Sequence, residues 1–353
     1  MSARSTFAKH QALSLLIGLI GAVVCLWANT PLPWMIGPLV ATAIAGMSGL
    51  PMVAAPALRN AGQWAIGTAL GLYFTPQVIA LVASQWAVIL IGIVWALCLG
   101  AAFGGWLAVT NRGLPGLDRS TTFFASAIGG ASEMTVLAER HGGRVELVVS
   151  AHSLRIVLVV VLIPFALQWA GLHGLDPSTP GPQEVRPLGL LVLCGACLGG
   201  AMLMQRFDLT NPWVLGPLAV ALLLTANGIE LSALPRWITN SGQLLIGVAL
   251  GTRFTRNFLR TAPRWLGTVA IGTIAMIVLS AAYAWLVADF ADLHPATVMV
   301  GTSPGGIAEM CLTAKALQLG VPVVTAFHVT RMVAVVLLAG PLFRLMPAAR
   351  RTP

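Results

Sequence analysis

A matched set of ionisable residues recurs in two apolar stretches of the chain. The first stretch holds Gly129, Gly130, Glu133, His152 and Arg155. The second holds Gly305, Gly306, Glu309, His328 and Arg331, at a constant offset of 176 residues. A carboxylate can bind a cation or carry a proton, an imidazole can carry a proton near neutral pH, and a guanidinium can bind an anion. The repeated spacing therefore predicts a site for ions or a small solute.

The composition places this set in a membrane. Hydrophobic residues make up 57% of the 353 residues and charged residues only 9%, against about 25% charged residues in soluble domains. Apolar runs near the roughly 20 residues that cross a bilayer recur along the whole chain. We therefore expect an all-α polytopic membrane protein that contacts the lipid bilayer.

Twelve apolar elements are predicted, six in each half of the chain. In residues 1–175 they span about 11–28, 31–49, 60–83, 85–109, 121–140 and 146–172. In residues 176–353 they span about 187–205, 211–228, 238–253, 264–289, 297–317 and 322–346. Polar sequence with several prolines, from Gly171 to Arg186, separates the halves as a loop. We interpret 1–175 and 176–353 as two membrane repeats.

Further matches support a duplication. Residues 33–39 correspond to residues 212–218, and ten of sixteen positions are identical between windows 60–75 and 240–255. Repeats of this length set the architecture of a chain. The second match pairs four uncharged polar residues, Asn60, Gln63, Asn240 and Gln243. These side chains could complete a substrate or sodium site, or they could form hydrogen bonds between helices.

The charges of the links predict that the repeats are inverted. One link of the second half carries Arg253, Arg256, Arg260 and Arg264, whereas its equivalent, Thr75–Gln85, has no charge. Positively charged links face the cytoplasm, so equivalent links should face opposite sides. Inversion needs an odd number of crossings per half. We therefore expect five transmembrane helices plus one re-entrant or broken Gly-Gly element in each repeat, with both termini in the cytoplasm. On this topology Arg350 and Arg351 lie inside.

The Gly-Gly elements are the expected breaks. Proline lacks an N–H, and glycine reaches backbone conformations that other residues do not. Non-helical backbone at membrane depth survives only where it lines a cavity enclosed by protein. Close packing of small residues is the alternative explanation. The run Ser303-Pro304-Gly305-Gly306 fits poorly in a continuous helix, which favours a break.

The carboxylates and arginines need partners in such a setting. An ionised carboxylate near the bilayer centre costs ~3 kcal/mol, so Glu133 and Glu309 must be paired, protonated or bathed by a cavity. The histidine and arginine of each set are three residues apart and share one helix face. Arginine stays charged, and a glutamate could supply its anion. Two interpretations remain: a structural Glu–Arg pair, or an Arg that attracts an anionic substrate while Glu or His carries a coupling proton.

The twin Gly-Gly-x-x-Glu-Met elements, the twin Asn-x-Gly-Gln segments and the full-length duplication resemble the AbrB-type bacterial membrane protein family. The resemblance covers nearly the whole chain. It implies distant kinship with inverted-repeat transporters such as the cation–proton antiporter and bile-acid symporter group. Members carry the labels ammonia monooxygenase and transition state regulatory protein, with a role in regulation of gene expression.

The activities that these labels name would each require particular residues. A monooxygenase needs a metal or flavin site, and the histidines and cysteines show no cluster with ligand spacing. Direct DNA binding needs a basic surface with interleaved aromatics, whereas the net charge of +9 is spread over short links. We expect no metal, no cofactor and no direct nucleic-acid partner.

The sequence thus predicts a secondary transporter in the bacterial inner (cytoplasmic) membrane, and not an enzyme. The expected substrate is a small solute, which is an anion if the arginines attract it. Its transport is coupled to protons or sodium ions. The site should lie where the broken elements meet near the midplane and should include the residues named above. A membrane-embedded sensor that affects gene expression through a partner is the alternative. A membrane monooxygenase ranks third, and a homo-oligomer is compatible with the sequence.

Overall fold

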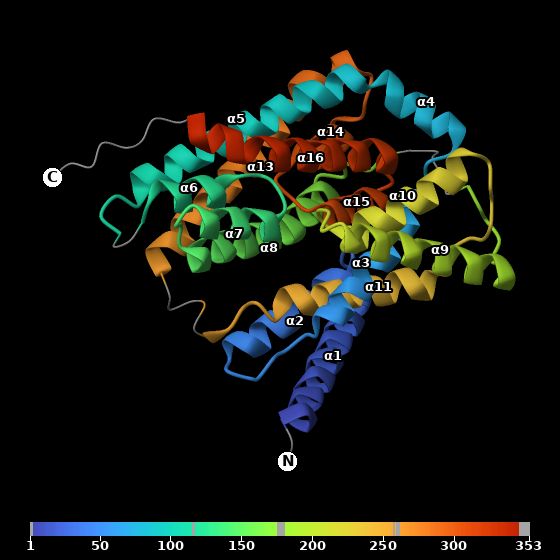
Figure 1. Cartoon of the computed structure of the whole chain (residues 1–353), viewed down its shortest axis with the longest axis horizontal. Helices are drawn as coiled ribbons and strands as arrows, with labels where there is room; N and C mark the ends of the chain where they lie inside the picture. The colour runs from blue at the N-terminus through green and yellow to red at the C-terminus, as the bar shows by residue number, and fades with distance from the viewer. Residues whose placement is uncertain (1–2, 115–116, 175–180, 257, 259–261, 346–353) are drawn as a thin grey trace. The chain divides into compact units, whose positions relative to one another are not determined.

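The computed structural model describes residues 3–114, 117–174, 181–256, 258 and 262–345 (Figure 1). Every regular element in these ranges is a helix, which confirms the predicted all-α class. Arg260, Arg350 and Arg351, which entered the topology argument, lie outside the described residues.

The chain divides into two compact units, and each takes segments from both sequence repeats. The first unit comprises Met1–Ser84, Pro164–Thr261 and Ala308–Val323. The second comprises Gln85–Ile163, Ala262–Ile307 and Val324–Pro353. The boundaries of these units differ from those of the sequence repeats 1–175 and 176–353, because both halves of the sequence contribute helices to both units.

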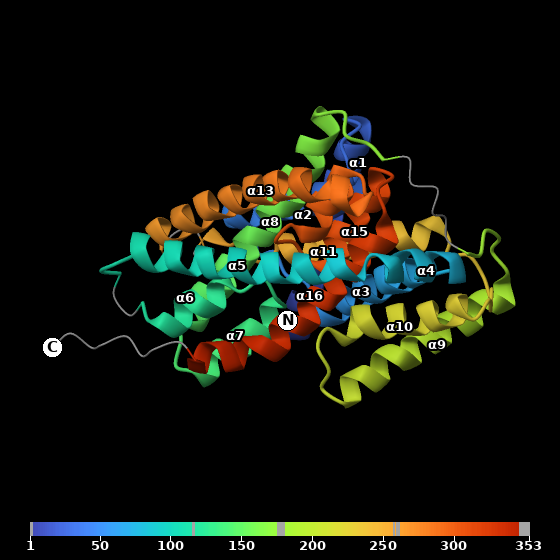
Figure 2. The same ribbon diagram turned by 90° about the horizontal axis from the view of Figure 1, so that it is seen from above.

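The first unit is a bundle of helices with reciprocal contacts. It contains α1 (Ala3–Trp27), α2 (Pro33–Met47), α3 (Pro56–Gly71), α4 (Pro76–Ser84), α9 (Pro187–Arg206), α10 (Pro212–Ala226), α11 (Arg236–Gly251) and nearly all of α15 (Ile307–Ala316). Helices α1 and α2 pack together, and so do their equivalents α9 and α10 (Figures 1 and 2). Helix α3 packs on α10, and its equivalent α11 packs on α2. Each half therefore makes the same contact with the other.

Glycines allow these helices to approach closely. A side chain at Gly67 would overlap the carbonyl oxygen of Val214 on α10, and one at the equivalent Gly247 would meet the backbone of Met35 on α2. Helices α3 and α11 cross at Gly62 and Gly242, where a Cβ on either glycine would lie 2.7 or 3.1 Å from the carbonyl oxygen of the other. Small residues at such crossings are the usual basis of helix packing in membranes.

The second unit combines long helices with short ones. It contains α5 (Trp86–Thr110), α6 (Arg119–Ser126), α7 (Ala131–Arg140), most of α8 (Val145–Trp169), α13 (Pro263–Ala291), α14 (Pro295–Thr302) and most of α16 (Val321–Leu345). Helix α5 packs on α13, α6 and α14 (Figures 1 and 2). The rings of Trp95 and Tyr283 stack with centroids 4.4 Å apart, and the indole N–H of Trp106 donates to the carbonyl of Thr268 at 3.1 Å. Together these contacts join α5 to α13.

Aromatic side chains fix the end of α16 within the second unit. Phe343 packs against the rings of Phe123, Phe124 and His141. The guanidinium of Arg119 lies over the Phe343 ring and donates to the Phe343 carbonyl at 2.8 Å. Arginine over an aromatic face is a favourable cation–π arrangement. The end of α16 is thereby tied to the start of α6 and the end of α7.

Within the residues that the structure describes, six helices are long and apolar enough to cross a membrane, and α3 with α4 counts as a seventh if the bent pair is one span. The chain is a multi-pass membrane protein. The predicted single element 60–83 is wrong in detail, because α3 and α4 meet at 88°. Pro76 begins α4 and has no N–H to continue the preceding helix. Most of the segment Thr75–Gln85, whose lack of charge entered the topology argument, is helical.

Candidate functional site

Both Gly-Gly elements are interrupted helices, as the sequence predicts. Helix α6 ends at Ser126 and α7 begins at Ala131. Helix α14 ends at Thr302 and α15 begins at Ile307. In each case the residue after the first helix has extended backbone, with ψ 131° at Ala127 and 152° at Ser303. Each break therefore exposes carbonyl groups at one helix end and N–H groups at the next helix start.

At the first break the glycines make room for neighbouring side chains, and at neither break do they adopt a left-handed backbone conformation. None of the four has a positive φ, so the expectation that they supply conformations closed to other residues is wrong. A Cβ on Gly129 would lie 2.8 Å from Val335 on α16, and a Cβ on Gly130 would overlap the carboxylate of Glu133. The missing side chains leave room for these neighbours.

His152 and Arg155 bind the carbonyl groups at the end of α6. Nε2 of His152 lies 2.9 Å from the Phe124 oxygen. The Arg155 guanidinium donates to the oxygens of Ala125, Ser126 and Ala127 at 3.4, 3.2 and 2.9 Å. These carbonyls have no partner inside the helix, and they carry the negative end of its dipole. A buried arginine is therefore balanced here by a helix end.

The second repeat builds the same arrangement at the end of α14. Nε2 of His328 lies 3.0 Å from the Val300 oxygen. The Arg331 guanidinium donates to the oxygens of Ser303 and Gly305 at 2.6 and 2.7 Å. Arg155 and Arg331 are only 2% and 5% exposed, so each cation depends on these carbonyls for compensation.

The arginines also fix the protonation of the histidines. An Nη2 of each arginine lies 2.8 Å from Nδ1 of its histidine. Because a guanidinium only donates, Nδ1 must accept, and the hydrogen of a neutral imidazole sits on Nε2. Nε2 can then donate to the helix carbonyl. The predicted role of histidine as a carrier of the coupling proton would require this network to break.

The sequence suggested a glutamate as the partner of each arginine, and the structure gives Arg155 a different one. Glu133 is the third residue of α7, and its carboxylate lies against Gly130 at the helix start. Ion pairs of 4.0 Å join Arg144 to Glu146 and Arg186 to Glu184, and Glu133 belongs to neither of them. A carboxylate in the first turn of a helix is stabilised by the exposed N–H groups and the positive end of the dipole.

Glu309 occupies the matching third position of α15, but its surroundings differ. Its carboxylate accepts a hydrogen bond from its own backbone N–H and interacts electrostatically with Arg59 and Arg253. Most residues of α15 are buried, whereas α7 buries only Met134 and Ala138. The two equivalent half-helices therefore have unequal environments.

The uncharged polar residues of the predicted site belong to the first unit. The Gln63 amide donates to Oδ1 of Asn211 at 3.4 Å. The Asn60 amide, oriented with its oxygen toward α10, accepts from the indole N–H of Trp213 at 3.1 Å. Asn240 and Gln243 lie half-buried on α11. The contacts of Asn60 and Gln63 follow the packing of α3 on α10.

The fourteen predicted residues thus fall into two groups. The second unit holds nine of them around the breaks and on α8 and α16. The first unit holds Asn60, Gln63, Asn240, Gln243 and Glu309. Sequence reasoning missed Arg59 altogether and used Arg253 only for topology. A signal for Arg59 exists in hindsight, since it directly precedes the matched Asn-x-Gly-Gln segment.

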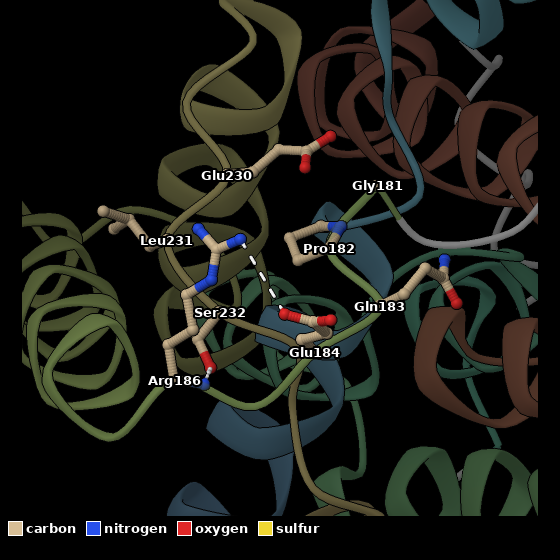
Figure 3. Close-up of a pocket in the computed structure, with 8 residues that line it drawn as sticks. All are labelled: Gly181, Pro182, Gln183, Glu184, Arg186, Glu230, Leu231 and Ser232. Carbon is tan, nitrogen blue, oxygen red and sulfur yellow. Dashed lines mark hydrogen bonds and ion pairs between the residues drawn. The ribbon is translucent and has the colours of Figure 1, made fainter.

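One pocket lies apart from these residues, in the first unit (Figure 3). The link before α9 and the segment 230–232 form it. Arg186 donates its backbone N–H to the Ser232 hydroxyl at 3.0 Å, and its guanidinium is 4.0 Å from the Glu184 carboxylate. That ion pair is exposed and contributes little to stability. None of the predicted site residues lines this pocket.

Within the described ranges, no group of three or more His, Cys, Asp or Glu side chains could hold a metal ion.

Comparison with known proteins extends over both repeats. The family described as "Transition state regulatory protein AbrB" matches residues 34–347. The chain is 24% identical over 329 residues to "Putative regulator AbrB" of Escherichia coli (strain K12), covering 92% of this chain and 92% of that protein. It is also 24% identical over 357 residues to "Uncharacterized protein YhjN" of Bacillus subtilis (strain 168), covering 94% and 91%. The family match includes both broken elements, and the chain therefore belongs to the AbrB family of membrane proteins.

Proposed function

We propose that the chain is a secondary transporter of a small anionic solute, coupled to protons or sodium ions. The observation that carries this proposal is the pair of helix breaks, each held by a matched His–Arg set. Breaks of this kind in membrane proteins provide N–H groups for anions and carbonyl groups for cations. Here the carbonyl ends bind arginine, so the N–H ends and their glutamates remain for the transported species.

A buried donor adds to this support. Nε of Arg155 is buried and has no hydrogen-bond partner among the described residues. Buried donors in native proteins are nearly always satisfied, if not by protein then by water, an ion or a ligand. A hydrated or occupied site at the first break accounts for this nitrogen.

The repeats are inverted in this proposal, with both termini in the cytoplasm of a bacterial cell. The reciprocal packing of α3 on α10 and α11 on α2 supports a twofold relation between the halves. In transporters built from inverted repeats, such a relation permits the site to open to either side in turn. Glu133 and Glu309 are then the groups that gain and lose the coupling ion.

Transport by the purified chain in sealed vesicles tests the proposal. The probes are labelled succinate, acetate and inorganic phosphate, each under an imposed proton or sodium gradient. The wild-type chain should accumulate at least one of them against its concentration gradient. Glu309→Gln keeps the shape and removes the charge, so it should lose uphill accumulation and retain exchange. Arg140→Gln, an exposed change on α7, serves as the control and should behave as wild type.

A regulator that acts through a partner protein is the second candidate, favoured by the name of the E. coli relative. A regulator of this kind needs no flux. Wild-type vesicles that carry none of the three probes under either gradient would overturn transport of small anions and leave the regulator.

A further inference from the structure

The pocket formed by the link before α9 and the segment 230–232 has walls that are fixed by hydrogen bonds (Figure 3). The backbone N–H of Ala233 donates to the Glu184 carbonyl at 2.8 Å, and that of Arg186 donates to the Ser232 hydroxyl at 3.0 Å. Ser232 is only 1% exposed, and its hydroxyl donates in turn to the Ala233 carbonyl at 2.9 Å. The cavity of about 240 Å³ is therefore preformed, which lowers the entropic cost of binding a ligand.

This pocket lies at one end of a membrane-spanning helix. Helix α9, a candidate span, begins at Pro187, directly after Arg186 of the pocket, and the segment 230–232 follows the end of α10. Apolar side chains next to the pocket are exposed, namely Val185, Leu188 and Ile229. Charged residues beside exposed apolar ones at the end of a span are typical of the boundary between bilayer and water. A dissolved solute and a lipid headgroup can both reach such a position.

Charged side chains of both signs line the cavity (Figure 3). Nη2 of Arg186 lies 4.0 Å from Oε2 of Glu184, and the two side chains are 64% and 82% exposed. A long and exposed ion pair contributes little stability, so Arg186 can exchange Glu184 for another anion at little cost. Within the part of the chain that the structure describes, Glu230 forms no ion pair. The pocket thus offers an unpaired carboxylate and a weakly held guanidinium.

A solvated link with scattered charges is the alternative explanation for these residues. Two observations favour a binding site. The three charged side chains surround one cavity, and the first repeat has no counterpart of them. At the offset of 179 or 180 residues between the repeats, Arg186 corresponds to Phe7, and Glu230 corresponds to Leu50 or Pro51. The architecture that the repeats share therefore does not require these charges.

We propose that this pocket binds a small group that carries both an ammonium and an acid anion, with the ammonium at Glu230 and the anion at Arg186. An ammonium donates hydrogen bonds to a carboxylate, and a guanidinium binds carboxylate or phosphate oxygens through paired, charge-assisted hydrogen bonds. The small, polar cavity suits an amino acid or the phosphoethanolamine headgroup of a lipid. The site is separate from the helix breaks and does not depend on the proposed transport.

Ligand-dependent thermal unfolding of the purified full-length chain in neutral detergent tests the site. The probes are glycine, β-alanine, 4-aminobutyrate and phosphoethanolamine, which differ in the separation of their two charges. At least one should raise the unfolding temperature with a saturable dependence, because a ligand that binds only the folded state stabilises it. Ethylammonium chloride and sodium acetate, alone or mixed, should not. An equal rise with either of these single charges refutes the requirement for both.

Matched variants locate the binding. Glu230→Gln and Arg186→Gln should each raise the apparent Kd about tenfold or more. The same changes at exposed positions elsewhere, Glu139→Gln on α7 and Arg206→Gln at the end of α9, should leave the Kd unchanged. Wild-type affinity in both Glu230→Gln and Arg186→Gln places binding elsewhere and overturns the proposal. If these variants fail to fold, the comparison of probes on the wild-type chain decides the question.

Glu184→Gln tests the exchange of partners at Arg186. It releases the guanidinium from its ion pair and removes no group that is assigned to the ligand, so the apparent Kd should fall about threefold. A Kd that rises in this variant places the ammonium at Glu184 and refutes the assignment to Glu230.

A comparison of lipids separates the two sources of the ligand. In nanodiscs, phosphatidylethanolamine carries an ammonium with N–H donors, whereas the quaternary ammonium of phosphatidylcholine has none. A higher unfolding temperature in phosphatidylethanolamine, lost in Glu230→Gln, identifies a lipid headgroup as the ligand. A saturable rise with the amino acids alone identifies a free solute. If neither the dissolved probes nor phosphatidylethanolamine stabilise the wild-type chain, the proposal is wrong.

Discussion

Nη2 of Arg155 donates to Nδ1 of His152 at 2.8 Å, and Arg331 makes the same 2.8 Å contact with His328. The contact joins two helix-capping residues into one unit, with a guanidinium and an imidazole directed at the same helix end. Its recurrence at both breaks indicates that each interrupted helix depends on it. The pair therefore accounts for the breaks as stable features of the fold.

The capping role of Arg155 predicts a large loss of stability on its removal. Arg155→Gln leaves buried carbonyls of α6 without their charged partner and should lower the free energy of unfolding by about 3 kcal/mol. Arg155→Lys keeps the charge and loses the planar fork, so its loss should be smaller but clear. The measurement is the yield and unfolding temperature of the purified chain, with Arg140→Gln as the control. An Arg155→Gln protein as stable as that control would refute the capping role.

The direction of the hydrogen bonds predicts the tautomer of both histidines. His152 and His328 should carry their hydrogen on Nε2, with Nδ1 free to accept from arginine. Nitrogen-15 chemical shifts of histidine-labelled protein distinguish the two tautomers at neutral pH. His141, whose Nδ1 lies 2.8 Å from the Leu137 oxygen, is an internal control and should carry its hydrogen on Nδ1. Signals from His152 or His328 with a hydrogen on Nδ1 would contradict the network.

The glycine contacts predict which helix crossings tolerate a methyl group. Gly67→Ala and Gly247→Ala each place a Cβ against backbone atoms of a neighbouring helix, and they should destabilise the chain by about 1–3 kcal/mol. Gly195 on α9 has no atom within 4 Å of the added Cβ. Gly195→Ala should be neutral or stabilising by about 0.5–1 kcal/mol. Comparable unfolding temperatures for all three variants would show that the crossings are not close.

Labelling of introduced cysteines tests the inverted topology. Gln77 on α4 and Thr255 after α11 are both exposed and lie in equivalent links of the two repeats. In a background with the five native cysteines replaced by serine, a membrane-impermeant maleimide should reach Gln77→Cys and Thr255→Cys from opposite sides. Inside-out and right-side-out vesicles provide the two sides. Reaction of both from one side would favour parallel repeats.

The helix breaks could be predicted from sequence because their cause is local. Ser303-Pro304-Gly305-Gly306 disrupts a helix whatever surrounds it, and the duplication extends the inference to Gly129-Gly130. The bend between α3 and α4 also has a local cause, since Pro76 follows the end of α3 within a few residues. That signal was outweighed by the continuous apolar character of 60–83.

The partners of the charged residues could not be predicted in the same way. The groups that bind Arg155 are backbone carbonyls, which are exposed only because α6 ends at Ser126. Reasoning from residue types considers side chains as partners and therefore misses them. The environment of Glu309 has a different cause. Arg59 and Arg253 are far from it in sequence, and only the folding of the chain brings them within electrostatic range of its carboxylate. Tertiary packing, rather than residue type, decides both cases.

The crossing of α3 and α11 has a meaning for the origin of the chain. Gly62 and Gly242 occupy equivalent positions, and each faces the backbone of the other. A contact between equivalent positions lies on a twofold axis, which is the geometry of a symmetric homodimer. Two identical half-length proteins could therefore have met at this glycine before their genes were joined. On this view the crossing preserves an ancient subunit interface inside a single polypeptide.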